Sequence, residues 1–463
     1  LEALLKENES YSWDNLIRPL EEKSDALSRA WSPVSHLHSV ADNEALREAY
    51  NTCLPKLIEF GTEMGQHEGL YQAYLQLQAS EAFPNLHIAQ KKSIGNALRE
   101  FRLSGIGLDE DERERYKNIK QEISALQTKF EENILDATQD WEKHIEEEAQ
   151  LAGLPTSAMA LAAQNAKAKD KTGWLINLEF PSYLPVMQYA DDRFLREELY
   201  QAFVTRASEQ GPSAGKWDNG EIMVETLALR QQQAELIGFD NYADYSLSRK
   251  MAADASEVLG FLNDLASRSK ADALADVNEL REFAKTEHQV SDLQAWDMAY
   301  YSEKLRVHKY DISQEQLRPY FPAPQVILGM FAVVNRLYGI TIKQVAGVEV
   351  WHDDVSYFEI HDSSARLRGS FYLDIYARPQ KRGGAWMDEC VVRRDTGSEL
   401  QTAVAYLNCN FTPPIADDPS LLTHDEVTTL FHEFGHGLHH MLSLIDFPEV
   451  SGINGVAWDA VEL

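Results

Sequence analysis

The residues best suited to chemistry lie near the end of the chain, where two histidines flank a glutamate. His432 and His436 are four residues apart, so on a helix their side chains project from the same side and can bind one metal ion. Glu433 follows the first histidine and is placed to accept a proton from a water molecule at that metal. This H-E-x-x-H pattern predicts a site that uses a metal ion to activate water.

The neighbouring residues indicate that this motif lies on a helix. Thr423 and Glu426 form a capping box, which predicts that the helix begins one to two turns before His432. The histidine pair falls opposite an apolar face. That face consists of Val427, Leu430, Phe431, Phe434, Leu438, Met441 and Leu442. Gly435 and Gly437 each cost about 1 kcal/mol relative to Ala in a helix, so we expect a strand or a bound substrate close to them.

A catalytic zinc usually has three protein ligands, so a third donor must come from elsewhere in the chain. No third histidine follows at the spacing of an H-E-x-x-H-x-x-G-x-x-H site. Residues 458–462 read as the start of a second helix, and from spacing alone Asp459 and Glu462 are close competitors. Asp446 and Glu449 lie in a connection that contains a proline.

The other histidines and cysteines near the motif are weaker candidates. We expect His424, His439 and His440 to lie at the surface or beside the ligands rather than to bind the metal. Cys390 and Cys409 precede the helix on predicted strands and lack a paired C-x-x-C spacing, so we interpret them as packed thiols.

The motif and residues 458–462 (WDAVE) together resemble the thimet oligopeptidase (M3) family of zinc metallopeptidases. Residues 180–187, 296–301 and 369–374 are also similar to the family's pattern, so the resemblance covers essentially the whole chain. Family members continue well beyond residue 463. We therefore interpret the chain as the front part of a longer enzyme.

The resemblance also implies a role for each site residue. His432 and His436 are expected to bind one Zn²⁺ per chain, with Glu462 as the third ligand and Glu433 as the catalytic base. Asp459 becomes a possible partner of the ligands. The implied activity is that of a zinc metalloendopeptidase, an oligopeptidase that hydrolyses short peptides.

The implied fold is mainly α, a large multi-helical neurolysin-like architecture with a small, late β-sheet beside the zinc-binding helix. Three regions are expected. Residues 1–150 form an N-terminal helical region, 151–340 form a helical region with one short strand that walls a channel, and 341–463 hold the sheet and the zinc helix. The longest helix is predicted to start near Asp109 and to run for about thirty residues, because apolar residues recur there at steps of three and four.

Alternation of period two predicts a group of strands late in the chain. They are expected at 345–351, 357–361, 370–376, 390–394 and 400–411, with a hairpin turn at residues 395–397. The last strand is either an edge strand that receives the substrate backbone or an interior strand. Order and alternation leave both readings open.

Composition excludes some functions. The 43 Lys and Arg residues against 74 Asp and Glu give a formal net charge of −31, which argues against binding to nucleic acids or anionic membranes. Three cysteines cannot form a disulfide framework, and the first residues lack the features of a signal peptide. We therefore expect a cytoplasmic protein, and we predict a monomer.

The sequence raises two alternative functions. Residues 211–215 fit the G-x-S-x-G pattern of serine hydrolases, but a helical pattern precedes them, so Ser213 is predicted to lie in a loop. The non-enzymatic alternative is a helical protein that binds a peptide or a metal without turnover, or an inactive fragment.

Overall fold

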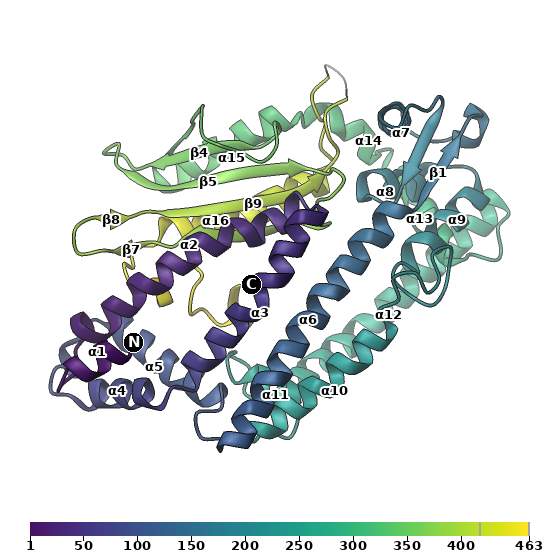
Figure 1. The fold of residues 1–463 in the computed structure, drawn as a ribbon. Coiled ribbons are helices and arrows are strands. Elements are labelled where there is room, and N and C mark those ends of the chain that lie inside the picture. Colours follow the sequence, from purple (N-terminus) through teal and green to yellow (C-terminus); the bar gives the residue numbers. More distant parts are fainter. Residues whose placement is uncertain (416–417, 462–463) are drawn as a thin grey trace.

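The computed structural model describes residues 1–415 and 418–461, and helices make up most of it (Figure 1). The mainly α class with a small late sheet, expected from the sequence, is confirmed. The division into three regions at residues 150 and 340 stays a prediction.

The N-terminal part is a succession of helices, as its apolar pattern predicts. They are α1 (Glu2–Glu7), α2 (Arg18–Val40), α3 (Glu44–Gly65), α4 (Glu68–Ala79), α5 (Ile88–Leu103) and α6 (Glu110–Asp140). The Asp109 carboxylate caps α6 by accepting a hydrogen bond from the Glu112 N–H. Tyr116, Ile119 and Ile123 of the predicted stripe are buried, so the long helix, 31 residues in length, is confirmed.

The middle of the chain adds a two-stranded sheet and further helices. They are β1 (Glu142–Ile145), α7 (Thr156–Ala168), β2 (Trp174–Asn177), α8 (Phe180–Tyr189), α9 (Arg193–Val204), α10 (Gly220–Leu236), α11 (Tyr242–Leu247), α12 (Ala255–His288), α13 (Met298–Tyr310), α14 (Gln314–Leu317) and α15 (Ala323–Tyr338). Gly238 follows α10 with φ of +88°, the left-handed conformation that commonly ends a helix. Pro181 lies in the first turn of α8, where its missing N–H is harmless.

A five-stranded sheet supports the candidate site. Its strands are β3 (Thr341–Gln344), β4 (Ser356–His361), β5 (Leu367–Tyr376), β6 (Trp386–Val391) and β9 (Ala403–Phe411), in the order β3-β4-β5-β9-β6. β5 and β9 are parallel, and the other neighbours are antiparallel. Helices α15 and α16 (His424–Leu442) share one apolar core with this sheet, through side chains such as Met330, Phe371 and Phe434.

Helix α2 packs on the sheet beside β6 and β9. The His36 ring stacks on the Tyr406 ring of β9 with 3.7 Å between centroids. On the same helix, the Ser32 hydroxyl donates a hydrogen bond to the Glu389 carbonyl oxygen of β6 at 2.7 Å. The N-terminal helices are thereby attached to the part of the sheet that precedes the zinc motif.

Two strand predictions were wrong in position. The strand expected at 390–394 is β6, which ends at Val391, and residues 392–393 are irregular. Residues 345–351 are irregular, and the strand lies earlier, in β3, because Gly347 turns the chain with φ of +80°. Of the two readings left open for 400–411, the interior strand is confirmed, because β9 pairs with β5 on one side and β6 on the other. The hairpin at residues 395–397 is confirmed between β7 (Arg394–Asp395) and β8 (Leu400–Gln401).

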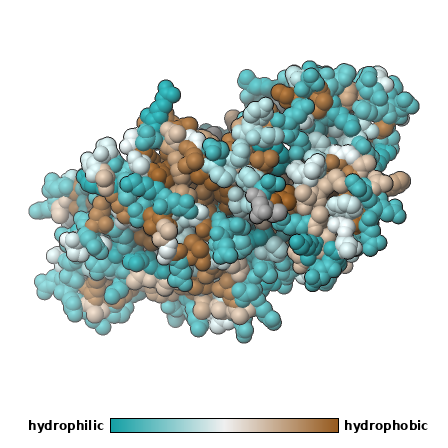
Figure 2. Space-filling view, turned by 90° about the horizontal axis from the view of Figure 1, so that it is seen from above, coloured by the Kyte–Doolittle hydropathy of each residue, from teal (hydrophilic) through white to brown (hydrophobic). Residues whose placement is uncertain are grey.

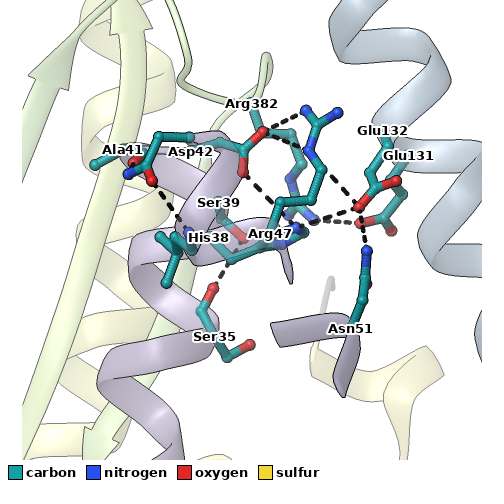
Figure 3. A network of polar contacts seen from close by, with 12 residues as sticks. Ser35, His38, Ser39, Ala41, Asp42, Arg47, Asn51, Glu131, Glu132 and Arg382 are labelled. Atoms are coloured by element: carbon teal, nitrogen blue, oxygen red, sulfur yellow. Dashed lines mark hydrogen bonds and ion pairs between the residues drawn. The ribbon is translucent and has the colours of Figure 1, made fainter. Parts of the chain in front are cut away.

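A polar network joins α2, α3 and α6 (Figure 3). Arg47 of α3 pairs with Asp42, at the end of α2, and with Asp136 of α6. Asn51 donates a hydrogen bond to Glu132 of α6 at 2.9 Å. The network fixes how the first long helices lie against α6.

The surface mixes hydrophilic and hydrophobic residues, and Figure 2 shows apolar patches among polar ones on the upper face. Leu328, Leu337 and Tyr338 of α15 are each more than half exposed. In the described ranges, no helix combines the length and the apolar character needed to cross a lipid bilayer.

Candidate metal centre

The start of α16 is fixed by the predicted capping box. The Thr423 hydroxyl accepts a hydrogen bond from the Glu426 N–H at 3.1 Å, and the Glu426 carboxylate accepts one from the Thr423 N–H at 2.7 Å. The same carboxylate also accepts the N–H of Thr412, just after β9, at 3.1 Å. The cap therefore fixes both the first turn of the helix and its position relative to the sheet.

The buried side of α16 follows the predicted pattern with one exception. Leu430, Phe434 and Met441 lie in the core, whereas Phe431 is 38% exposed because it falls at the margin of the apolar face. A Cβ atom at Gly437 would lie 3.0 Å from Leu407 of β9, so the predicted close neighbour there is a strand.

The opposite side of α16 brings the two histidines together. The Nε2 atoms of His432 and His436 are 3.1 Å apart, and their rings are perpendicular. Two zinc–nitrogen bonds of about 2.0–2.1 Å at a tetrahedral angle would separate their nitrogens by about 3.3 Å. His432 is exposed and His436 partly exposed, which leaves the pair accessible to a substrate. The donor set and its spacing fit a single zinc ion.

Glu433 lies beside this pair on the buried side of the helix, with 7% of its surface exposed. Its carboxylate is close enough to Cys409 of β9 to influence that thiol. Burial first, and then the charge of Glu433, raises the pKa of Cys409. Cys409 is therefore a protonated, fully buried thiol, and Cys390 is a partly buried one, as predicted.

The third ligand predicted from the resemblance, Glu462, lies outside the described residues. Its competitor Asp459 is on α17 (Trp458–Val461), and its carboxylate accepts hydrogen bonds from the backbone N–H groups of Met251 and Ala252 at 2.9–3.0 Å. These bonds lower the pKa of Asp459. Asp459 therefore attaches α17 to the connection before α12.

No group of three His, Cys, Asp or Glu side chains in residues 1–415 and 418–461 could hold a metal ion. The described chain thus contributes two nitrogen donors from α16. Of the other acids after the motif, Asp446 pairs with Arg393 at 2.7 Å.

The remaining histidines of α16 differ from one another. His439 is exposed, and the His424 ring lies edge-on to Phe321. His440 is 1% exposed and hydrogen bonds to the Val391 carbonyl oxygen at 3.1 Å. Of the two positions expected for His440, the surface is therefore excluded, because its ring is buried against β6.

The serine hydrolase pattern does not form a nucleophile site. Residues 211–215 lie in turns after α9, with no strand before them, as predicted. Ser213 therefore lacks the strand-to-helix turn that this chemistry requires.

Known families and proteins are similar to this chain along its whole length. The family described as "Peptidase family M3" matches residues 186–463, and "Neurolysin/Thimet oligopeptidase, N-terminal domain" matches residues 1–113. Oligopeptidase A of Escherichia coli (strain K12) is 54% identical over 465 residues, a match that covers 100% of this chain and 68% of the relative. "Probable cytosolic oligopeptidase A" of Arabidopsis thaliana is 42% identical, with the same coverage.

A solved structure described as "PZ peptidase A with inhibitor 2" has a similar fold. Its TM-score is 0.51 at 14% sequence identity, and the match covers 97% of this chain and 63% of that chain. At this identity the similarity concerns the fold alone.

Proposed function

The chain belongs to peptidase family M3, and from this premise we propose that His432 and His436 hold a zinc ion beside Glu433 as general base. The chain is a metallo-endopeptidase of the oligopeptidase type. We assign the third ligand to Glu462, on the resemblance of residues 458–462 to the family's pattern.

The observation that carries the zinc assignment is the 3.1 Å separation of the two Nε2 atoms on the accessible side of α16. Zinc held there would lower the pKa of a water molecule and polarise the scissile carbonyl. The burial of Phe434 and Met441 in the sheet core supports the proposal, because it holds the helix rigidly while the histidine pair faces outward.

In this proposal, Glu433 is the general base and then the general acid. Its carboxylate takes a proton from the attacking water and later passes one to the leaving amine. The adjacent position in the sequence and the low exposure of Glu433 support this role, since a carboxylate held against β9 has little freedom to move away. No covalent bond to the protein is needed.

Short peptides are the proposed substrates, in line with the name of the relatives, oligopeptidase A. A cytoplasmic location is supported by the name of the plant relative, "Probable cytosolic oligopeptidase A". A monomer is supported by the net charge of −31, because strong like charge opposes self-association.

Glu433→Gln tests the assignment. We expect this variant to keep one zinc per chain in elemental analysis and to lose cleavage of a quenched fluorescent peptide by about 100-fold or more. Glu399→Gln is the control. Glu399 is exposed and lies in the turn between β7 and β8, so this variant should cleave the peptide at the wild-type rate. Normal turnover by Glu433→Gln would refute the role of Glu433.

A further inference from the structure

The strand at the sheet edge next to β9 is β6. An edge strand presents backbone N–H and C=O groups that have no partner within the sheet. A peptide can bind to such groups as an additional strand. The part of this edge that lies beside Glu433 is therefore where a substrate backbone would meet the general base.

Helix α16 runs along β9 in the direction opposite to the strand. A Cβ atom at Gly437 would lie 3.0 Å from Leu407, and the Glu426 carboxylate accepts a backbone N–H just after the end of β9 at 3.1 Å. Four residues of a helix cover about 6 Å, which is about the length of two residues in a strand. Glu433 precedes Gly437 by four residues and therefore lies over Cys409, in agreement with the influence of its charge on that thiol.

Glu433 also lies on the side of α16 that faces β6. Glu433 and His440 are seven residues apart, so their side chains project from nearly the same side of the helix. The Nε2 of His440 hydrogen bonds to the Val391 carbonyl oxygen of β6 at 3.1 Å. The carboxylate of Glu433 is therefore directed toward the edge of the sheet rather than toward α15.

The register of the sheet identifies the edge residues at this position. Trp386 of β6 is opposite Asn408 of β9, so residue 385 comes beside Cys409. Residues 383 and 384, just before it, are both glycines. The segment 383–385 therefore forms the edge beside Glu433.

Asn410, near the end of β9, holds this segment in place. Its side-chain amide donates hydrogen bonds to the carbonyl oxygens of Arg382 and Gly384, at 2.8 and 2.6 Å. Gly384 has φ of +95°, in the left-handed region that favours glycine. The amide of Asn410 thus fixes the turn that leads into β6.

The segment presents its backbone to open space. No backbone carbonyl among the described residues accepts a hydrogen bond from the N–H groups of residues 383–385. Gly383 and Gly384 are exposed, and no described heavy atom beyond the adjacent residues would lie within 4 Å of a Cβ atom at either position. Glycines at a strand often mark a place where another backbone approaches closely.

We propose that residues 383–385 form a subsite that binds the backbone of the peptide substrate, and that Asn410 is a positioning residue that holds this subsite beside Glu433. The inference rests on the proposed function, because it assumes that the peptide is cleaved at the histidine pair. The N–H groups of the segment donate hydrogen bonds to peptide carbonyl oxygens, so this contact does not depend on the side chains of the substrate.

Gly383→Ala tests the subsite. The φ of Gly383 lies outside the left-handed region and the space beside it is open, so the fold accepts a methyl group that then lies in the path of the peptide. Fluorescence anisotropy measures the dissociation constant of a short fluorescein-labelled peptide in the Glu433→Gln background, where the peptide is not cleaved. We expect this constant to rise about 3–10-fold, the effect of about one hydrogen bond, and equally for two labelled peptides with different side chains.

Gly107→Ala is the matched control. Gly107 is also an exposed loop glycine outside the left-handed region with open space beside it, but it lies between α5 and α6. We expect this substitution to leave the dissociation constant of both peptides unchanged.

Asn410→Ala tests the positioning role. It should raise KM about 3–10-fold with kcat close to wild type, because it loosens the subsite without removing a zinc ligand or the base. Zinc content in elemental analysis should stay at the wild-type value. Asn335→Ala is the control: the Asn335 amide donates to the Ile340 carbonyl oxygen at 2.7 Å beside β3, at the opposite edge of the sheet. We expect that control to lower the thermal unfolding midpoint without changing KM.

The outcomes separate this inference from the proposed function. Wild-type dissociation constants and KM in both Gly383→Ala and Asn410→Ala would overturn the subsite, even if zinc-dependent cleavage is observed. If Asn410→Ala does not fold, Gly383→Ala decides the question. A wild-type chain that does not cleave the peptide but binds it through residues 383–385 would overturn the proposed function and support the subsite, whereas one that binds no peptide would overturn both.

Discussion

Histidines and carboxylates meet in two regions of this molecule, and their different arrangements teach what makes such a cluster a candidate active site. In the network between α2, α3 and α6, the Nε2 of His38 lies 3.9 Å from Asp42 and 3.8 Å from Glu132 (Figure 3). By residue type alone, this trio resembles a metal-binding set as closely as the zinc motif does.

Arg47 makes the difference. Its guanidinium pairs with Asp42 and Asp136 and lies 3.7 Å from Glu132, so a fixed positive charge already occupies the space that a metal ion would need. On α16, by contrast, two nitrogen donors converge at 3.1 Å on an accessible side. A cluster whose centre holds a guanidinium is structural, whereas nitrogen donors that converge on an accessible side make a candidate site.

The largest expected effect is on the metal. His436→Ala removes one of the two converging donors, so we expect zinc affinity to fall by more than about 100-fold, beyond the usual effect of residues that only orient ligands. Peptide cleavage should fall with it. His38→Ala is the control in the other region and should leave zinc affinity unchanged; loss of zinc in that variant would break the comparison.

The next largest effect is on the free energy of unfolding, through the network between α2, α3 and α6. Arg47→Met leaves Asp42 and Glu132, which are 4% and 6% exposed, without their cation, so unfolding free energy should fall by about 3–5 kcal/mol. Urea denaturation measures this, and zinc affinity should stay at the wild-type value. Arg99→Met breaks an exposed pair with Glu100 and should cost at most about 1 kcal/mol. Equal losses in the two variants would contradict the structural role of the network.

These two regions also mark how far the sequence predicts the structure. The zinc helix and α6 were predictable because caps, periodicity and the spacing of His432 and His436 are local properties. The network was not, because it joins residues 42, 47 and 132 through long-range packing.

The position of β9 in the sheet was left open for a related reason. Edge and interior strands share an alternating pattern, and pairing with β5 and β6 is decided by distant segments. One local signal was available: residues 403–407 (AVAYL) form a nearly continuous apolar run, which is typical of a strand buried on both faces.

Glu21, a carboxylate outside both regions, tests how the absence of a paired cation affects stability. Burial first, and then the negative charge of Glu449, raises the pKa of Glu21 to about 8 from 4.5. Between pH 4.5 and about pH 8, the folded state therefore binds a proton on Glu21 that the unfolded state does not bind. The stability linked to this proton is complete below about pH 4.5 and is lost as pH rises to about 8.

Glu21→Gln cannot ionise, so its stability should not fall over this pH range. Relative to wild type it should gain on the order of 1 kcal/mol at pH 8 and little at pH 5, less than the full linkage value because Glu21 is partly exposed. Urea denaturation at both pH values measures the difference. Glu22→Gln, at the exposed neighbouring residue, should show the wild-type pH dependence.

The smallest effect compares two glycines within α16. Among the described residues, no heavy atom beyond the helix's own nearby backbone would lie within 4 Å of a Cβ atom at Gly435, so Gly435→Ala should stabilise the helix by about 0.5–1 kcal/mol. Gly437→Ala must displace Leu407 and should gain less or lose. Because no described residue outside the helix's own backbone lies beside Gly435, we propose that the close neighbour expected there is the bound peptide. Gly435→Ala should therefore raise the thermal unfolding midpoint while lowering kcat/KM for peptides, and a stabilised variant with unchanged kcat/KM would show that the substrate passes elsewhere.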